Sequence, residues 1–327
     1  MKITVFEVSP DERKELAHLA ATLPVELRLE ERALNDDTLA AAEGSEAIST
    51  LGRSRLDRYM LEKLKAMGVG YLSTRTIGFD HIDLAACREL GLRVSHADYP
   101  PEAVADFTIM LILLVLRCYK PAMWRQNVND YSLKGLMGRS MNKQTIGVVG
   151  TGSIGATVIR ELSGFRCRIL AYNRSIKEDL KQYCEFVDLE TLYRESDIIT
   201  FHVPCTPETR YMVNRDSISR MKDGVILVNT ARGELMDIDA LTEGIENEKI
   251  GSLTMDVFEH EQGIYHADRK TDILKNKDMV YLRQFPNVVL TQHMAFYTEE
   301  SITSMVDCGI HTLLDMKEGR KNRLELV

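Results

Sequence analysis

The run Thr145–Gly155, which reads TIGVVGTGSIG, constrains this chain most, because a short apolar strand ends in three glycines and passes into a helical pattern. The first glycine permits a tight turn, the second lets a pyrophosphate approach the main chain, and the third lets the helix pack closely on the strand. The glycines are Gly150, Gly152 and Gly155, and the helical amides expected to face the phosphates are those of Ser153 and Ile154. The run predicts a dinucleotide-binding unit, and almost half of the chain precedes it.

Strand-like apolar runs alternate with helical patterns along the whole chain of 327 residues, which is long enough to bury two cores. In the first part we expect strands at 2–8, 25–29, 47–51, 69–74 and 92–97, and helices at 58–67 and 81–90. After Pro100 and Pro101, a long helix over 102–117 leads into the second part. There we expect six strands, at 145–149, 167–172, 197–203, 225–230, 250–257 and 287–292, and a last helix at 298–317.

This alternation predicts an α/β fold with two doubly wound parallel-sheet domains. We expect a Rossmann dinucleotide-binding domain at 100–297, inserted in a flavodoxin-like substrate domain formed by 1–99 and 298–327.

Composition excludes several classes of function. The net charge of −8 and the absence of a basic stripe argue against nucleic acid as a partner. The most apolar stretch, at 109–116, is shorter than the roughly 20 residues that span a bilayer, so we expect no membrane segment. The six cysteines show no metal-ligand spacing, which favours a cytoplasmic protein without disulfides or a metal site.

The end of the second strand of a dinucleotide-binding domain usually carries an acidic residue that binds the ribose hydroxyls and repels a 2′-phosphate. Here the strand ends in Asn173, Arg174 and Ser175, with no carboxylate. Because Arg174 offers a planar cationic fork for a phosphate, the sequence favours NADP(H), with NAD(H) possible.

Polar residues follow three further strands, at the edge where open parallel sheets bind ligands. Reduction of a 2-oxo acid needs a cation for the carboxylate, a proton donor, and a carboxylate that keeps the donor charged. Arg232, His293 and Glu261 provide these three groups, and Glu259 competes with Glu261.

The chain resembles the D-2-hydroxyacid dehydrogenase family over its whole length, through the runs 148–155, 202–204, 228–233, 255–261 and 293–297. Within the family it is most similar to D-lactate dehydrogenases of the vancomycin-resistance type. That subgroup shares 73–78, Tyr99, 104–108, an insertion before the last strand, and Tyr172–Ser175 without an acidic residue.

The resemblance implies roles for individual residues. Arg232 holds the substrate carboxylate, His293 donates the proton, Glu261 supports His293, and Asp256 binds the nicotinamide amide. The other implied cofactor contacts are Ser153, Ile154, Asn173 to Ser175, Val203, Pro204, Thr209, Thr230 and Ala231. The implied substrate contacts are Ile77, Gly78, Tyr99 and Phe296.

Two departures from the family pattern concern the substrate pocket. Met294 follows His293 where the family commonly has threonine, and Leu133 stands where several D-lactate dehydrogenases have tryptophan. We therefore expect a reductase of a 2-oxo acid, with pyruvate first and a bulkier or aromatic 2-oxo acid or hydroxypyruvate as alternatives. An NAD(H)-sensing, corepressor-like scaffold is the non-enzymatic alternative, and the apolar helix at 103–117 together with the resemblance favours a homodimer.

Overall fold

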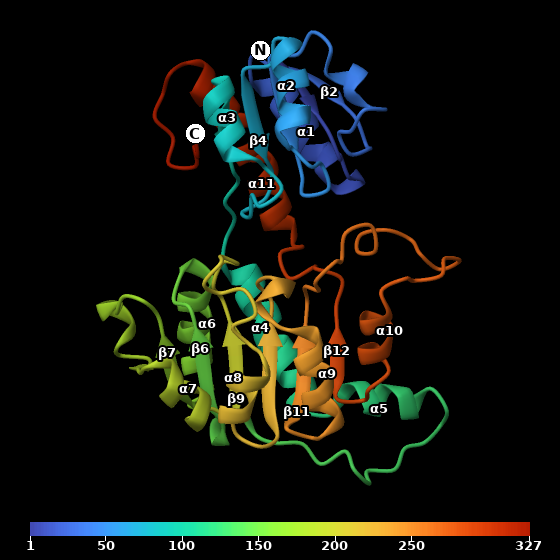
Figure 1. Ribbon diagram of the computed structural model, residues 1–327, viewed down its shortest axis with the longest axis vertical. Coiled ribbons are helices and arrows are strands. Elements are labelled where there is room, and N and C mark those ends of the chain that lie inside the picture. Colours follow the sequence, from blue (N-terminus) through green and yellow to red (C-terminus); the bar gives the residue numbers. More distant parts are fainter. The chain divides into compact units, whose positions relative to one another are not determined.

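The computed structural model describes residues 1–327 and divides into two compact units, each with its own sheet (Figure 1). The smaller unit comprises residues 1–100 and 297–327, and the larger comprises residues 101–296.

The smaller unit is built on a five-stranded parallel sheet in the order β2-β1-β3-β4-β5. Its strands are β1 (Lys2–Val5), β2 (Glu26–Leu29), β3 (Ala47–Thr50), β4 (Tyr71–Thr74) and β5 (Arg93–Ser95). Its helices are α1 (Arg13–Thr22), α2 (Arg58–Ala66), α3 (Leu84–Leu90) and α11 (Glu299–Lys317). Since this strand order is the flavodoxin-like one, the expected class is confirmed for this unit.

Alternate residues of these strands enter two separate cores. Ile3 and Ala47 pack with α1 and α11, whereas Phe6 and Ile48 pack with α2 and α3. Because side chains point to opposite faces every second residue, β3 is buried on both faces, and so is β1 after Lys2.

The larger unit contains a seven-stranded parallel sheet in the order β12-β11-β10-β9-β6-β7-β8. Its strands are β6 (Thr145–Val149), β7 (Arg168–Tyr172), β8 (Glu185–Phe186), β9 (Ile198–Phe201), β10 (Val225–Asn229), β11 (Ile250–Met255) and β12 (Val288–Leu290). The expectation of six strands was wrong by one. Strand β8 has two residues, which is too short to give a periodic signal, and it pairs with Leu170 and Ala171 of β7.

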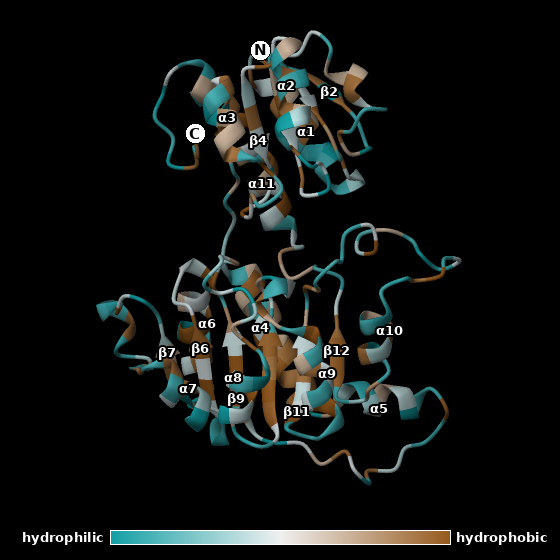
Figure 2. Cartoon of the chain, viewed as in Figure 1, coloured by the Kyte–Doolittle hydropathy of each residue, from teal (hydrophilic) through white to brown (hydrophobic).

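Helices cover both faces of this sheet. One face packs against α7 (Leu189–Glu195), α8 (Arg215–Arg220), α9 (Ile238–Glu246) and α10 (Lys277–Arg283). The other packs against α4 (Glu102–Leu116) and α6 (Ser153–Ser163), and α5 (Tyr119–Gln126) follows α4. Figure 2 shows the central strands in hydrophobic colours between helices with hydrophilic outer faces. Short 3-10 helices lie at Pro10–Glu12, Leu39–Ala42, Met141–Lys143, Glu178–Leu180 and Gly233–Leu235.

The strand order around β6 is the doubly wound order of dinucleotide-binding folds, so the expected class is confirmed here as well. It places the switch point between β6 and β9, where the glycine turn lies. None of the helices combines the length and the apolar character that crossing a lipid bilayer requires.

Candidate active site

The glycine turn joins β6 to α6 at the carboxyl edge of the larger sheet. Gly150 has a φ of 92°, and a Cβ there would lie 2.6 Å from the carbonyl oxygen of His202. A Cβ on Gly155 would clash with the carbonyl of Gly150, whereas one on Gly152 would meet nothing within 4 Å. No side chain caps the first turn of α6, which begins at Ser153. The turn therefore leaves main-chain amides open on one side, as a bound pyrophosphate requires.

The loop after β7 is held by Asn173. Its side-chain nitrogen donates to the carbonyl of Ser175 at 2.8 Å, and its oxygen accepts from the amide of Thr151 at 3.4 Å. Arg174 is exposed, and no carboxylate occurs among residues 173–175. The loop thus lies beside the glycine turn and carries a cation where many dinucleotide-binding domains carry an anion.

The segment after β9 contains Val203, Pro204 and Thr209. The hydroxyl of Thr209 donates to the carbonyl of Pro204 at 2.6 Å and closes this loop on itself. His202 lies just before it and shares a 2.9 Å hydrogen bond with the hydroxyl of Thr200. Burial lowers the pKa of His202 to about 3, so its ring is neutral beneath the glycine turn at physiological pH.

The loop after β10 carries Thr230, Ala231 and Arg232. Asn229 shapes it by accepting from the amide of Ala231 at 3.0 Å and donating to the carbonyl of Arg232 at 2.8 Å. The hydroxyl of Thr230 bonds that of Thr108 on α4 at 2.9 Å. Arg232 is half-buried, and it is followed by Gly233, where a Cβ would clash with the main chain at residues 258 and 259. This close approach brings the loop after β11 against the loop that carries the arginine.

Asp256 directly follows β11 and is fully buried. One carboxylate oxygen accepts from the hydroxyl of Thr291 at 2.6 Å and the amide of Met294 at 2.9 Å, and the other accepts from the amide of Ala295 at 2.8 Å. The side chain therefore holds the turn over residues 291–295. Its contact with the nicotinamide amide stays a prediction from the resemblance.

His293 and Glu261 form a hydrogen-bonded pair. The Nδ1 of His293 donates to Glu261 at 2.5 Å, and the other carboxylate oxygen accepts from the amide of Phe258 at 2.7 Å. Glu259, the competing carboxylate, instead accepts from Arg210 at 2.8 Å and from the hydroxyl of Tyr211 at 2.7 Å. The structure thus pairs Glu261 with the imidazole and leaves its Nε2 for a reacting group.

Two rings lie beside this pair. His266 lies 6.0 Å from the His293 ring between centroids and 6.3 Å from Phe296, and Phe296 lies edge-on to His293 at 6.3 Å. Sequence reasoning named Phe296 but missed His266, because the segment between β11 and α10 has no periodicity that fixes its path. The segment contains two histidines, His260 and His266, and this residue type was the signal that the sequence offered.

The remaining expected contacts, Ile77, Gly78 and Tyr99, belong to the smaller unit. Ile77 and Gly78 follow β4, and the hydroxyl of Thr76 donates to the carbonyl of Gly78 at 2.6 Å. The preceding Arg75 is fully buried and bonds Glu12 at 2.6 Å, which anchors the start of this loop. Tyr99 is half-buried after β5. Their contact with substrate stays a prediction.

The two departures from the family pattern are both exposed. Leu133 lies in the segment between α5 and β6 with 83% of its surface accessible, and Met294, next to the imidazole, is 38% accessible.

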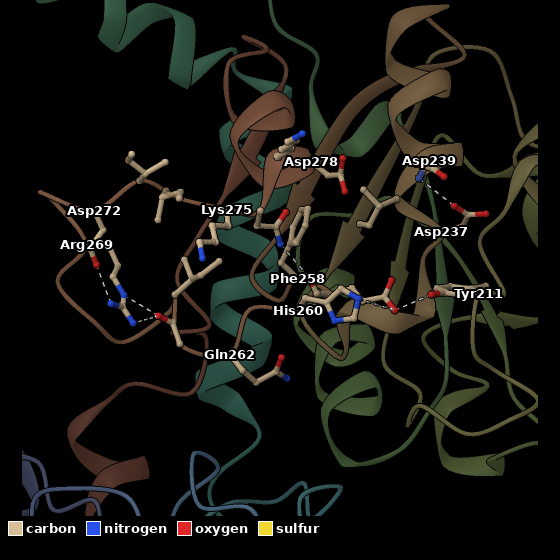
Figure 3. A pocket seen from close by; sticks show the side chains of 18 of the residues that line it. Tyr211, Asp237, Asp239, Phe258, His260, Gln262, Arg269, Asp272, Lys275 and Asp278 are labelled. Atoms are coloured by element: carbon tan, nitrogen blue, oxygen red, sulfur yellow. Dashed lines mark hydrogen bonds and ion pairs between the residues drawn. The ribbon is translucent and has the colours of Figure 1, made fainter.

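A separate pocket of about 1150 Å³ lies between the segment 258–278 and the start of α9 (Figure 3). Figure 3 shows Tyr211, His260, Gln262 and Lys275 around the cavity. The hydroxyl of Tyr211 donates there to Glu259. Neither Glu261 nor His293 lines it, so it is distinct from the candidate active site.

An open glycine turn and an imidazole–carboxylate pair, both at the carboxyl edge of a doubly wound sheet, define the class of NAD-binding oxidoreductases. A family model described as "D-isomer specific 2-hydroxyacid dehydrogenase, NAD binding domain" matches residues 109–295. The chain belongs to the D-isomer specific 2-hydroxyacid dehydrogenase family.

Curated relatives match nearly the full length. The chain is 38% identical over 320 residues to the aromatic 2-oxoacid reductase of Clostridium sporogenes, covering 97% of this chain and 96% of the relative. It is 37% identical to the D-lactate dehydrogenase of Escherichia coli, covering 100% of both chains. It is 35% identical to the D-specific alpha-keto acid dehydrogenase of Enterococcus faecium, covering 98% of both.

Solved structures agree with these matches. The apo-structure of D-lactate dehydrogenase from Escherichia coli superposes with a TM-score of 0.89 at 36% identity, covering 100% of both chains. An NAD-complexed D-isomer specific 2-hydroxyacid dehydrogenase from Lactobacillus delbrueckii superposes with a TM-score of 0.85 at 27% identity over 100% of both. The expected family and its resemblance to D-lactate dehydrogenases are confirmed.

Proposed function

We propose that this protein reduces a 2-oxo acid to the corresponding D-2-hydroxy acid. The observation that carries the proposal is the 2.5 Å hydrogen bond between His293 and Glu261, at the sheet edge that also carries the glycine turn and Arg232. A dinucleotide-sensing scaffold needs the glycine turn but has no use for a proton donor. The pair therefore favours an enzyme over the non-enzymatic alternative.

A bound nicotinamide cofactor would supply the hydride that the carbonyl carbon of the substrate accepts. His293 gives its Nε2 proton to the carbonyl oxygen, and its Nδ1 stays bonded to Glu261. Glu261 orients the ring through this hydrogen bond, so that Nε2 faces the substrate. Arg232 binds the substrate carboxylate through its planar guanidinium, which suits a carboxylate in two-point contact.

We propose NADP(H) as the preferred cofactor, with NAD(H) as the alternative. The glycine turn would hold the pyrophosphate through the amides at Ser153 and Ile154, and residues 173–175 would contact the ribose. Support comes from Arg174, which is exposed beside that turn, and from the absence of a carboxylate in the loop. An arginine at this point attracts a 2′-phosphate, whereas an acidic residue would repel it.

Pyruvate is the substrate that we propose first, and the match to D-lactate dehydrogenases supports it. An aromatic 2-oxo acid is the second candidate, because His266 and Phe296 form a ring surface next to His293 and a relative is an aromatic 2-oxoacid reductase. Ring pairs at such distances add about 0.5–1.5 kcal/mol beyond area burial, so an aromatic side chain would gain contacts that a methyl group lacks.

We also propose a homodimer formed through α4. The apolar residues Ile109, Met110 and Leu113 line a groove of about 370 Å³, with Asp106 near one end and Arg117 near the other. These two charges are about three helical turns apart. In an antiparallel pair of α4 helices, the acidic end of each groove meets the basic end of the other, as a two-fold interface requires.

One assay tests the proposed reaction. Purified protein is given NADPH or NADH with 2-oxo acids of graded size, and the product is resolved on a chiral column. We expect turnover to the D-product, and loss of nearly all turnover in His293→Ala with cofactor binding retained. His260→Asn is the matched control, since His260 is an exposed histidine near Glu261 and asparagine tolerates its φ of 62°. Unchanged turnover in His293→Ala would refute the assignment.

A further inference from the structure

The segment that follows Glu261 folds back over the His293–Glu261 pair. The carbonyl of Glu261 accepts from the amides of Ile264 at 2.9 Å and Tyr265 at 3.1 Å, which closes a tight turn. The next residue, His266, lies beside the His293 ring, with centroids 6.0 Å apart. A second imidazole thus lies next to the proton donor, although 27 positions separate the two residues.

His293 adopts a main-chain conformation that needs support. Its φ is 53°, in the left-handed region that costs a residue other than glycine about 1–3 kcal/mol. Its amide donates to the carbonyl of Asp256 at 2.7 Å. Its own carbonyl lies 3.0 Å from the Nε2 of His266. Both polar main-chain groups of the strained residue are therefore engaged.

Resting on the proposed function, we infer that His266 is a positioning residue for the proton donor. A carbonyl oxygen only accepts, so Nε2 of His266 carries the hydrogen and donates it to the carbonyl of His293. The edge-on contact with Phe296, at 6.3 Å, keeps the His266 ring in place for this bond. Asp256 thus holds the amide of His293 and His266 holds its carbonyl, and together they fix the direction in which the His293 ring leaves the turn.

Loss of this bond affects the chemical step more than binding. The cofactor contacts proposed at the glycine turn are made by residues 150–155 and do not include His266. A freer turn lets the imidazole leave the geometry in which Nδ1 bonds Glu261 and Nε2 faces the reacting carbonyl. Misplacement of a donor by a fraction of an ångström lowers the rate without a matching loss of affinity.

Two variants separate the hydrogen bond from ring packing. His266→Phe keeps a ring against Phe296 but has no donor, whereas His266→Gln loses the ring and keeps an N–H near the position of Nε2. With pyruvate, whose methyl group does not extend to the ring surface, we expect kcat to fall roughly three- to tenfold in His266→Phe, or about 0.7–1.4 kcal/mol, with KM for pyruvate and for the cofactor within about twofold. His266→Gln restores most of kcat. Thermal denaturation checks that both variants are folded.

The opposite pattern, full kcat in His266→Phe with loss in His266→Gln, would overturn the inference in favour of simple packing. Equal kcat in all three proteins would overturn it as well. A ¹⁵N–¹H spectrum of histidine-labelled protein tests the bond without turnover, because the neutral His266 ring should show the Nε2–H tautomer. An Nδ1–H tautomer contradicts the inference whatever the activity. Absence of turnover in the wild type, with the expected tautomer, would count against the proposed function alone.

Discussion

The half-buried His202, whose imidazole lies beneath the glycine turn, predicts a specific loss of stability in acid. The ring bonds Thr200 at the end of β9, and its burial lowers its pKa from the ordinary 6.5 to about 3. Because the folded-state pKa lies below that of the unfolded chain, the unfolded chain takes up this proton first. The stability associated with the neutral ring is therefore complete above pH 6.5 and is lost as the pH falls toward 3.

The magnitude follows from the pH interval. Each pH unit between the two pKa values costs about 1.4 kcal/mol of unfolding free energy. Two units, from pH 6.5 to pH 4.5, give a loss of roughly 2 to 3 kcal/mol from this one residue. This is a substantial part of the roughly 5–15 kcal/mol that stabilises a typical folded protein.

Urea unfolding of the wild type and of His202→Gln at pH 7, 6, 5 and 4.5 isolates this contribution. Glutamine reaches Thr200 and does not titrate, so the groups common to both proteins cancel in the difference. Between pH 7 and pH 4.5, we expect the free energy of unfolding of the wild type to fall by roughly 2 to 3 kcal/mol more than that of the variant. This expectation does not depend on the difference in stability between the two proteins at pH 7. The same substitution at His18, exposed on α1, is the matched control. A difference that stays constant with pH would refute the reasoning.

Three further predictions concern the cofactor, the catalytic turn and assembly. Arg174→Asp should raise the KM for NADPH at least tenfold more than that for NADH, because a carboxylate repels the 2′-phosphate; equal effects would indicate damage to the loop. Asp256→Asn should lower the free energy of unfolding in urea by about 2–4 kcal/mol and remove most of kcat, because a buried amide cannot accept all three hydrogen bonds. Unchanged stability would contradict the role of Asp256 in holding the turn. Met110→Lys should shift the protein from dimer to monomer in analytical ultracentrifugation, and an unchanged mass would place the interface elsewhere.

The inner strands were predictable because they are largely apolar runs bounded by turns and are buried on both faces, whereas the edge strand β2 is mostly exposed. All five strands of the smaller unit lie within their expected ranges. Strand β8 was missed because Glu185 and Phe186 carry no pattern. The sequence narrowed the partner of His293 to two carboxylates, Glu261 and Glu259, but the residues alone did not exclude Glu259. The position of Arg210 and Tyr211, which engage Glu259, depends on contacts between loops that the sequence does not reveal.

The same limit explains why His266 escaped sequence reasoning. Its place depends on a turn closed by main-chain amides on Glu261 and on left-handed conformations at both His266 and His293, where φ is 59° and 53°. Neither residue is a glycine or an asparagine, so no residue type marks these positions as left-handed.

The strain at His293 also accounts for the buried charge at Asp256. A carboxylate with no exposed surface is costly unless its oxygens are bonded, and here three donors of the 291–295 turn satisfy them. Those bonds fix the amides that follow His293, while the amide of His293 itself bonds the Asp256 carbonyl. Asp256 thus supports the left-handed turn at His293. The cost is the burial of a carboxylate, which a loop without this strain would not need. Asp256, Phe258 and His266, which support the His293–Glu261 pair, all lie within residues 101–296. The pair is therefore formed by contacts inside the larger unit.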